Sequence, residues 1–177
     1  MKYFIISDIH GSLTYLSKAM NQYKKSNADC LIILGDILYH GARNPLAEGY
    51  NPKGCIELLN EHASKIIAIR GNCDSEVDQM VLDFVLQETN ILIHLNKKVF
   101  LTHGHIYEKH SQLTEGDIFI NGHTHVVRAE EIDGIHYLNP GSITLPKESS
   151  VRSYAILSED FKVYSLEGEL VREYRLW

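Results

Sequence analysis

The stretch KYFIISDIHG, residues 2–11, joins a short apolar run to a polar cluster. Apolar residues fill positions 3–6, which is typical of a buried β-strand. In α/β folds, functional sites collect just beyond the carboxyl ends of such strands, and Asp8 and His10 stand there. Gly11 follows and allows a tight turn. The stretch therefore predicts an α/β fold with a site that starts at the end of its first strand.

The next sixty residues continue the alternation of helix and strand. Ser12 is suited to cap a helix, because apolar residues recur at helical spacing after it. CLIIL, residues 30–34, is a second apolar run, and KIIAIR, residues 65–70, is a third. Pro52 between them favours a helix start. The order strand, helix, strand, helix, strand predicts parallel strands with right-handed crossovers.

The remainder of the chain has a different pattern. KKVFLT, residues 97–102, and DIFIN, residues 117–121, are strand-like. Residues 152–176 resemble a short meander with turns near SED and EG. No internal repeat, low-complexity segment or linker interrupts the chain. We therefore expect one α/β domain over residues 1–177, with mixed rather than purely parallel sheets.

Length, charge and cysteine content narrow the class of protein. A chain of 177 residues suits one domain with a sizeable core. Its formal charge of −6 argues against stable nucleic-acid binding, which normally requires a basic surface. Asp8 interrupts the first apolar run too early for a signal peptide, and no run reaches transmembrane length. Three cysteines without C-x-x-C spacing favour neither disulfides nor a zinc knot, so we expect a cytoplasmic protein.

Five strand-like runs each stop at a polar cluster: SDIHG, LGD, RGNCD, THGH and NGHTH. The candidate ligands that we take from these clusters are two carboxylates, one amide and four imidazoles. These side chains are Asp8, His10, Asp36, Asn72, His103, His123 and His125. Glycines beside them permit close approach of the backbone. So many candidate ligands exceed the requirement of a single ion.

Carboxylate and imidazole ligands without thiolates suit Mn²⁺, Fe²⁺ or Zn²⁺. A shared aspartate can hold two ions about 3.5–4 Å apart, as in two-metal hydrolases. Two divalent ions bring four positive charges, Asp8 and Asp36 remove two, and a bridging hydroxide removes one. The remaining positive charge would attract a phosphodiester, and metal coordination makes hydroxide available near neutral pH. We therefore expect metal-assisted hydrolysis of a phosphate ester.

The motifs DIHG, GD, GNCD, HGH and GHTH, in this order, resemble the signature of calcineurin-like metallophosphoesterases. Residues 35–50, 70–80, 101–105 and 139–147 are similar to the small bacterial YfcE family of phosphodiesterases. The resemblance extends from about residue 3 to residue 147. It implies a four-layer sandwich of two mixed sheets with helices outside. It also implies a two-metal site, with Mn²⁺ first and Fe²⁺, Zn²⁺ or Ni²⁺ as alternatives.

Carried over by position, the resemblance assigns Asp8, His10 and His125 to the first ion and Asn72, His103 and His123 to the second. Asp36 would bridge the two. Many superfamily members carry a histidine where this chain has Cys73, and a thiol is a poor substitute for an imidazolium donor. Esters with good leaving groups should therefore react faster. The alternative proton donors are His40 and His105, and the substrate-binding candidates are Arg43 and Asn44.

Each feature also has an ordinary interpretation. Glycine–aspartate pairs are common turns, and Cys73 could be a packing residue. Arg43 could pair with Glu48 rather than with a phosphate. Two other functions use the same scaffold: phosphomonoesterase or phosphoprotein phosphatase activity, and a non-catalytic platform like a eukaryotic retromer subunit. A homo-oligomer formed through Tyr174, Leu176 and Trp177 is a further alternative to internal packing of the tail.

Overall fold

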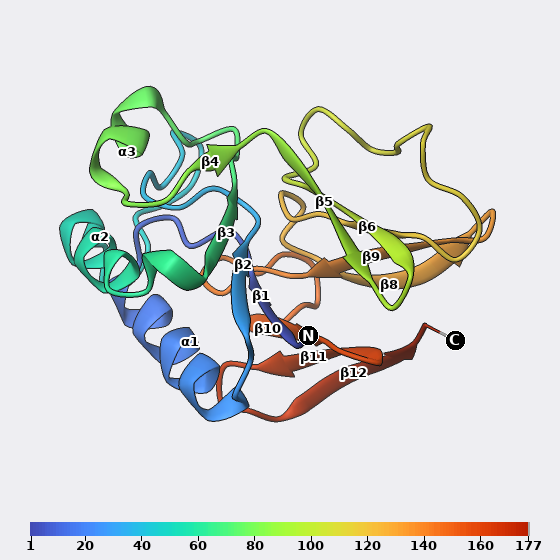
Figure 1. Cartoon of the computed structure of the whole chain (residues 1–177). Helices are drawn as coiled ribbons and strands as arrows, with labels where there is room; N and C mark the ends of the chain where they lie inside the picture. The colour runs from blue at the N-terminus through green and yellow to red at the C-terminus, as the bar shows by residue number, and fades with distance from the viewer. Residues whose placement is uncertain (177) are drawn as a thin grey trace.

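The structure is a computed structural model that describes residues 1–176. Two β-sheets pack face to face, and helices lie outside the first sheet (Figure 1). The first sheet has the order β12-β11-β10-β1-β2-β3-β4. Its strands are β1 (Tyr3–Ile6), β2 (Cys30–Ile33), β3 (Ile66–Ile69), β4 (Leu86–Gln87), β10 (Ser153–Leu157), β11 (Asp160–Ser165) and β12 (Leu170–Arg175).

The second sheet has the order β5-β6-β7-β9-β8. Its strands are β5 (Thr89–His94), β6 (Lys97–Thr102), β7 (Ile118–Ile120), β8 (Val127–Ile132) and β9 (Ile135–Pro140). In the first sheet a block of parallel strands ends at the β4 edge and adjoins antiparallel strands on its other side, whereas in the second sheet antiparallel strands border a parallel centre. β1 to β4 run parallel while β10 to β12 run antiparallel, and β6, β7 and β9 are parallel between antiparallel β5 and β8. The prediction of mixed sheets is confirmed.

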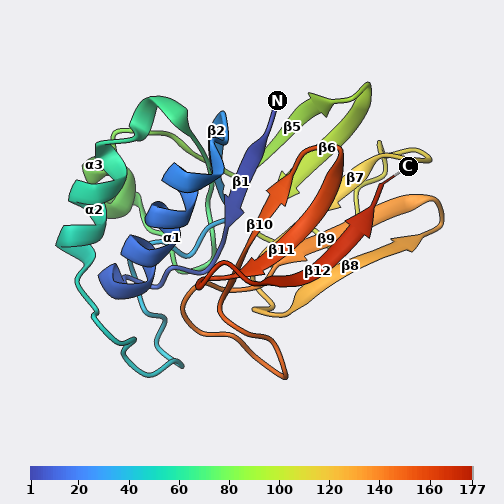
Figure 2. The same ribbon diagram turned by 90° about the horizontal axis from the view of Figure 1, so that it is seen from below.

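The predicted alternation of strands and helices in the first third of the chain is also confirmed. The helices are α1 (Leu13–Ser26), α2 (Pro52–Asn60) and α3 (Glu76–Val81), with a 3₁₀ turn at Ala63–Lys65. Ser12 caps α1, because its side chain accepts a hydrogen bond from the backbone N–H of Tyr15. Pro52 opens α2, where its missing N–H costs nothing. Figure 2 shows α1 and α2 against one side of the first sheet.

Two apolar layers hold the sheets and helices together. One layer lies between the helices and the first sheet and includes Phe4, Leu16 and Ile33, all fully buried. The other lies between the sheets and includes Ile5 and Leu101. Because neighbouring residues of β1 point to opposite faces, Phe4 and Ile5 serve different layers. Both faces of β1 are therefore buried, which explains its uninterrupted apolar sequence.

The outer face of the second sheet differs from the expected layer of helices. Here the irregular segment between β6 and β7 covers the strands, and Leu113 packs with Phe100, Phe119 and Tyr137. A few large side chains bury the aromatic face, so no helix is needed to shield it. The fourth layer of this sandwich is therefore a loop.

The C-terminal meander is confirmed, and β10 pairs with β1 in the middle of the first sheet. Leu176 is buried between the sheets and Tyr174 packs beside it. The tail residues thus pack internally, while Trp177 lies outside the described residues. Among the helices formed by residues 1–176, none has the length and apolar content needed to span a bilayer.

Candidate metal centre

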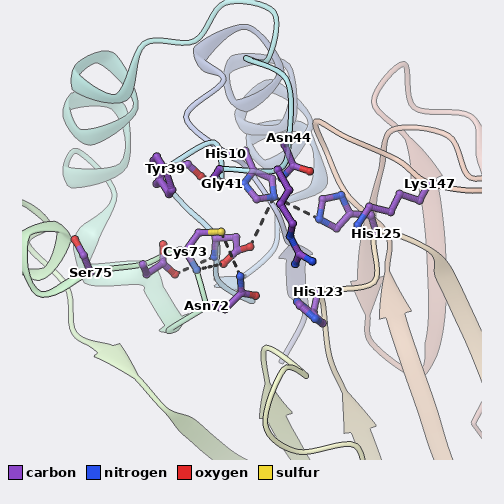
Figure 3. Close-up of a pocket in the computed structure, with 14 residues that line it drawn as sticks. His10, Tyr39, Gly41, Asn44, Asn72, Cys73, Ser75, His123, His125 and Lys147 are labelled. Atoms are coloured by element: carbon purple, nitrogen blue, oxygen red, sulfur yellow. Dashed lines mark hydrogen bonds and ion pairs between the residues drawn. The ribbon is translucent and has the colours of Figure 1, made fainter.

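The five polar clusters meet at one end of the two sheets. Asp8, Asp36 and Asn72 follow β1, β2 and β3 of the first sheet, while His103 and His123 follow β6 and β7 of the second. Both sheets direct the carboxyl ends of these parallel strands to the same edge. All seven predicted ligand positions therefore lie in one region, and several of them surround the cavity in Figure 3.

The first donor group contains Asp8, His10 and His125, all buried. The Asp8 Oδ1 atom lies 3.2 Å from His125 Nε2 and 3.9 Å from His10 Nε2. The two Nε2 atoms are 3.4 Å apart, and Figure 3 shows the two rings facing each other. Three donor atoms from three chain segments thus point at one small volume.

Backbone carbonyls fix the tautomers of these rings. His10 Nδ1 lies 3.0 Å from the Tyr39 oxygen, and His125 Nδ1 lies 2.5 Å from the Leu145 oxygen. A carbonyl oxygen can only accept, so Nδ1 of each ring carries the proton. The Nε2 atom of each ring then faces Asp8. Histidine ligands of metals are oriented in this way.

The second donor group is built around Asp36 and His103. The Asp36 Oδ1 atom lies 3.4 Å from His103 Nε2, and its Oδ2 atom lies 3.7 Å from His10 Nε2. The carboxylate of Asp36 therefore directs one oxygen toward each group. His103 Nδ1 donates to the Leu34 oxygen at 2.5 Å, so its Nε2 also faces inward. Asp8, Asp36 and His103 together have the spacing of a cation site.

Asn72 and His123 complete this side with more exposure. The Asn72 Oδ1 atom is 3.1 Å from His103 Nε2, although the Asn72 side chain is exposed. The ring of His123 is half-buried, and its centroid lies 5.1 Å from that of His103. The structure therefore brings both predicted residues to the centre, on its open side.

The chemistry of the donors fits a cation. Asp8 Oδ1 is buried and has no hydrogen-bond partner among the described residues. It faces the Nε2 atoms of His10 and His125, so a carboxylate oxygen and two ring nitrogens converge. A buried carboxylate oxygen left in this state is costly. A divalent ion would satisfy all three groups together.

In the metal-free protein, the proton of His103 partly fills this role. Burial alone lowers the pKa of His103. The hydrogen bond to Asp36 and the negative charges of Asp8 and Asp36 outweigh burial and raise the pKa to about 9. Burial likewise raises the pKa of Asp36, but His103 and the Cys73 N–H reverse the shift, and the carboxyl pKa falls well below its usual range. The His103 proton therefore occupies a position that a cation would take.

Five of the seven donor residues have left-handed backbone conformations. Their φ angles are positive in a region that disfavours side chains: Asp8 57°, His10 48°, Asp36 56°, His123 66° and His125 63°. Such conformations cost free energy and are typical of functional sites. The chain accepts this strain to turn sharply after each strand and point the side chains at the centre.

Two glycines allow these turns to meet. A Cβ atom at position 71 would overlap Asp36 Oδ1, and one at position 122 would overlap Ser7 Oγ and crowd Asp8. Only glycine leaves room for the carboxylates at these positions. Gly71 of GNCD and Gly122 of GHTH thus have a steric reason to be glycines in this chain.

Sequence reasoning gave no role to Asp74, which the structure places beneath the centre. Its carboxylate accepts hydrogen bonds from the backbone N–H groups of Asp36, Ile37 and Gly71 at 2.7–2.9 Å. Burial raises the pKa of Asp74 to about 6 despite these bonds. Asp74 ties the loop after β2 to the loop after β3. Asp74 is the last residue of the motif GNCD, but the sequence pattern does not predict its partners.

A cavity of about 700 Å³ opens over the donors. Arg43, Asn44, Cys73 and Lys147 line it together with Tyr39 and Ser75. The sequence predicts no role for Lys147, because only folding brings it beside His125. The backbone N–H of Lys147 donates to the carbonyl oxygen of His125. Arg43 forms no ion pair with another residue of the range 1–176, and the expected alternative partner Glu48 accepts from Tyr15 instead.

The three candidate proton donors lie in different places. Cys73 lines the cavity, where burial and then Asp36 raise its pKa to about 12, so the thiol stays protonated. His40 is not among the cavity-lining residues; its ring packs against Tyr39 and Tyr50. His105 is exposed and lines a neighbouring cavity. Only Cys73 therefore shares the cavity with the donors.

Comparisons with known proteins agree with this geometry. Residues 1–162 match the calcineurin-like phosphoesterase superfamily domain. Phosphodiesterase YfcE of Escherichia coli K12 is 46% identical over 163 residues, which cover 90% of this chain and 89% of that protein. A solved structure of YfcE, a phosphoesterase from E. coli, superposes with a TM-score of 0.96 at 41% identity over the full length of both chains.

A more distant structure shares the fold alone. Zinc-bound Vps29 from Entamoeba histolytica has a TM-score of 0.65 at 20% identity and covers the full length of both chains. The family match and the identity to YfcE carry more weight, since the matched residues 1–162 contain all seven donor positions. The family implies divalent metal ions and hydrolysis of phosphoric esters. The chain therefore belongs to the calcineurin-like phosphoesterase superfamily, within the YfcE family, and is a metal-dependent phosphoesterase.

Proposed function

We propose that this protein is a phosphodiesterase with a dinuclear metal centre. One observation carries the proposal: the two oxygens of Asp36 face different donor groups, with Oδ1 toward His103 and Oδ2 toward His10. A single carboxylate between two groups is the arrangement expected of a bridging ligand. The name of the relative at 46% identity supports phosphodiesters as substrates.

In this proposal each residue keeps a defined task. Asp8, His10 and His125 would hold the first ion, while Asn72, His103 and His123 would hold the second. When bound, the two ions supply hydroxide near neutral pH and stabilise charge on the phosphoryl oxygens. The anchored Nδ1 atoms of His10, His103 and His125 keep their rings aimed without rearrangement.

The cavity residues orient the ester. Arg43 offers a planar set of N–H donors suited to a phosphate, and Asn44 is held in place by a bond from its Nδ2 to the His40 oxygen. This contact gives His40 a supporting position in the substrate loop rather than a place at the reacting atoms. Cys73 remains a neutral thiol, and a weak acid protonates a poor leaving group slowly. We infer that aryl esters react faster than alkyl esters.

The decisive experiment compares bis-aryl and mono-aryl phosphates at saturating Mn²⁺ in one assay. A phosphodiesterase hydrolyses the diester faster, and activity disappears after chelation and returns with metal. Preference for the monoester would instead establish a phosphomonoesterase or phosphoprotein phosphatase. Absence of both bound metal and hydrolysis would favour the non-catalytic platform, although all seven donor positions carry the residues expected of metal ligands.

Several finer points belong to the same proposal. We propose Mn²⁺ as the working metal, with Fe²⁺, Zn²⁺ and Ni²⁺ to be compared in the same assay, because availability often decides among such ions. Residues 1–177 would form one domain acting in the cytoplasm on a small phosphodiester. Stable nucleic-acid binding is not expected at a net charge of −6. Analytical ultracentrifugation would establish whether the chain forms a homo-oligomer.

A further inference from the structure

A second cavity lies beside the metal centre and has no role in the mechanism above. It measures about 350 Å³ and is lined by Arg70, Leu86, Glu88, His105 and Ile106. This volume falls within the usual range of small-molecule sites. The cavity is formed by the end of β3, by β4 and the start of β5, and by the loop that follows β6. In Figure 1 the chain crosses from the helical side to the second sheet through β4 and β5.

His105 connects this cavity with the metal centre. Its ring centroid lies 5.3 Å from that of His103 and 6.1 Å from that of His123. Arg70 stands two positions before Asn72 at the end of β3. The cavity therefore adjoins the open side of the centre, where Asn72 and His123 are exposed or half-buried.

The walls of this second cavity combine apolar surface with a flat imidazole. Leu86 is 6% exposed and forms a firm wall, while Ile106 is 57% exposed. His105 adds the face of its ring. Apolar side chains gain free energy when a ligand removes their surface from water. A methyl group would cover little of Ile106, whereas an aromatic ring placed against the Leu86 wall would cover more of it.

The rim carries one donor group and one acceptor group. Arg70 Nη1 donates to Glu76 Oε1 at 2.7 Å, which uses one of the five N–H groups of its guanidinium. Glu88 Oε1 accepts from the Tyr107 hydroxyl at 3.0 Å, so the acidic side chain is held at the rim. A flat apolar slot with a guanidinium and a carboxylate at its edge suits a ring that has polar edges.

We propose that this second cavity is a subsite for one ester group of the substrate, and that the group it takes is a flat aromatic ring, either an aryl group or a nucleobase. The inference rests on the proposed function, because a phosphate held at the metal centre is what delivers the ring to the cavity. It also assigns His105 to substrate positioning rather than to proton donation.

The test measures binding, so it does not depend on turnover. Protein loaded with Mn²⁺ is titrated by calorimetry with methyl phosphate, phenyl phosphate and adenosine 5′-monophosphate. Phenyl phosphate should bind roughly tenfold more tightly than methyl phosphate, as expected for partial burial of one ring. Tighter binding of the nucleotide than of phenyl phosphate assigns the subsite to nucleobases, and the reverse order assigns it to simple aryl groups.

Two substitutions of exposed isoleucines test whether the second cavity causes the tighter binding of phenyl phosphate. Ile106→Ser should reduce the advantage of phenyl over methyl phosphate to about threefold or less while methyl phosphate binds as before. Ile132→Ser, at an exposed position of β8, is the matched control and should keep the full advantage. Glu88→Gln should weaken only the nucleotide if its base reaches the rim.

The outcomes separate the two proposals. Equal binding of all three esters, or a phenyl advantage that survives Ile106→Ser, overturns the subsite and leaves the metal centre intact. If none of the esters binds to the metal-loaded protein, both the subsite and the phosphate-binding centre are refuted.

Discussion

The two donor groups contain similar residues but differ in how firmly the chain holds them. In the first group Asp8, His10 and His125 are all buried, and both rings are anchored through Nδ1 to backbone carbonyls. In the second group Asn72 is exposed and His123 is half-buried. Preorganised, desolvated ligands bind a cation more tightly than mobile ones. We therefore expect the first group to retain its ion and the second to exchange its ion with solvent.

Asp36→Asn should have the largest effect, because Asp36 faces both groups. Removal of the charge should lower bound metal from two ions to one or none, and hydrolysis by roughly 1000-fold or more, since loss of a group that only supports a ligand already costs 10–100-fold. Elemental analysis and diester turnover measure the two effects. Equal metal content and activity in the variant and wild type would contradict the bridge.

The pair His125→Ala and His123→Ala tests the contrast between the groups directly. His125→Ala removes a buried ligand of the first group, so the tightly held ion should be lost and activity should fall by about 100-fold. His123→Ala should leave one ion that resists chelation. If both variants lose the resistant ion equally, the two groups do not differ as we propose.

Metal affinity should also depend on pH through the second group. The pKa of His103 is raised to about 9, so a cation must displace its proton at neutral pH. This competition weakens as pH rises, and affinity for the second ion should increase roughly tenfold per pH unit up to about pH 9. Calorimetry in buffers of different ionisation heat counts the released proton. An affinity that stays constant from pH 7 to pH 9 would show that no proton is displaced.

Asp74→Asn should have the smallest effect and act on stability. Its carboxylate accepts three backbone N–H bonds, whereas an amide would turn its own N–H₂ toward at least one of these donors. The free energy of unfolding should fall by about 1–3 kcal/mol. Urea denaturation of the metal-free protein measures this change, with Asp133→Asn at an exposed turn as control. If the two variants are equally stable, Asp74 does not tie the two loops together.

The strands near the N-terminus were predictable because their signals are local. β1, β2 and β3 are short apolar runs, and Ser12 and Pro52 mark helix starts by their own chemistry. The irregular fourth layer was not predictable in this way. It depends on which side chains fill the face of a sheet once the strands are paired, and its packing joins Leu113 to the distant Tyr137.

The candidate site likewise combines features predictable from local sequence with features that depend on long-range contacts. Motif order and residue type identified the seven donor positions, but the role of each as a ligand remains a proposal. Residue type could not separate Cys73, which lines the cavity, from His40, which packs behind it. Nor could it reveal Asp74 and Lys147, since both owe their positions to contacts made across loops.

The amino-acid sequence by itself determined the α/β class, the strand ends that carry polar residues, and the chemistry of the donors. These properties follow from side-chain type and from spacing along one segment of chain. The tertiary structure alone decided that two sheets direct their strand ends to one edge, that Asp36 lies between two donor groups, and that a second cavity adjoins them. Such features arise from long-range packing, in which distances between remote segments are set by the whole fold.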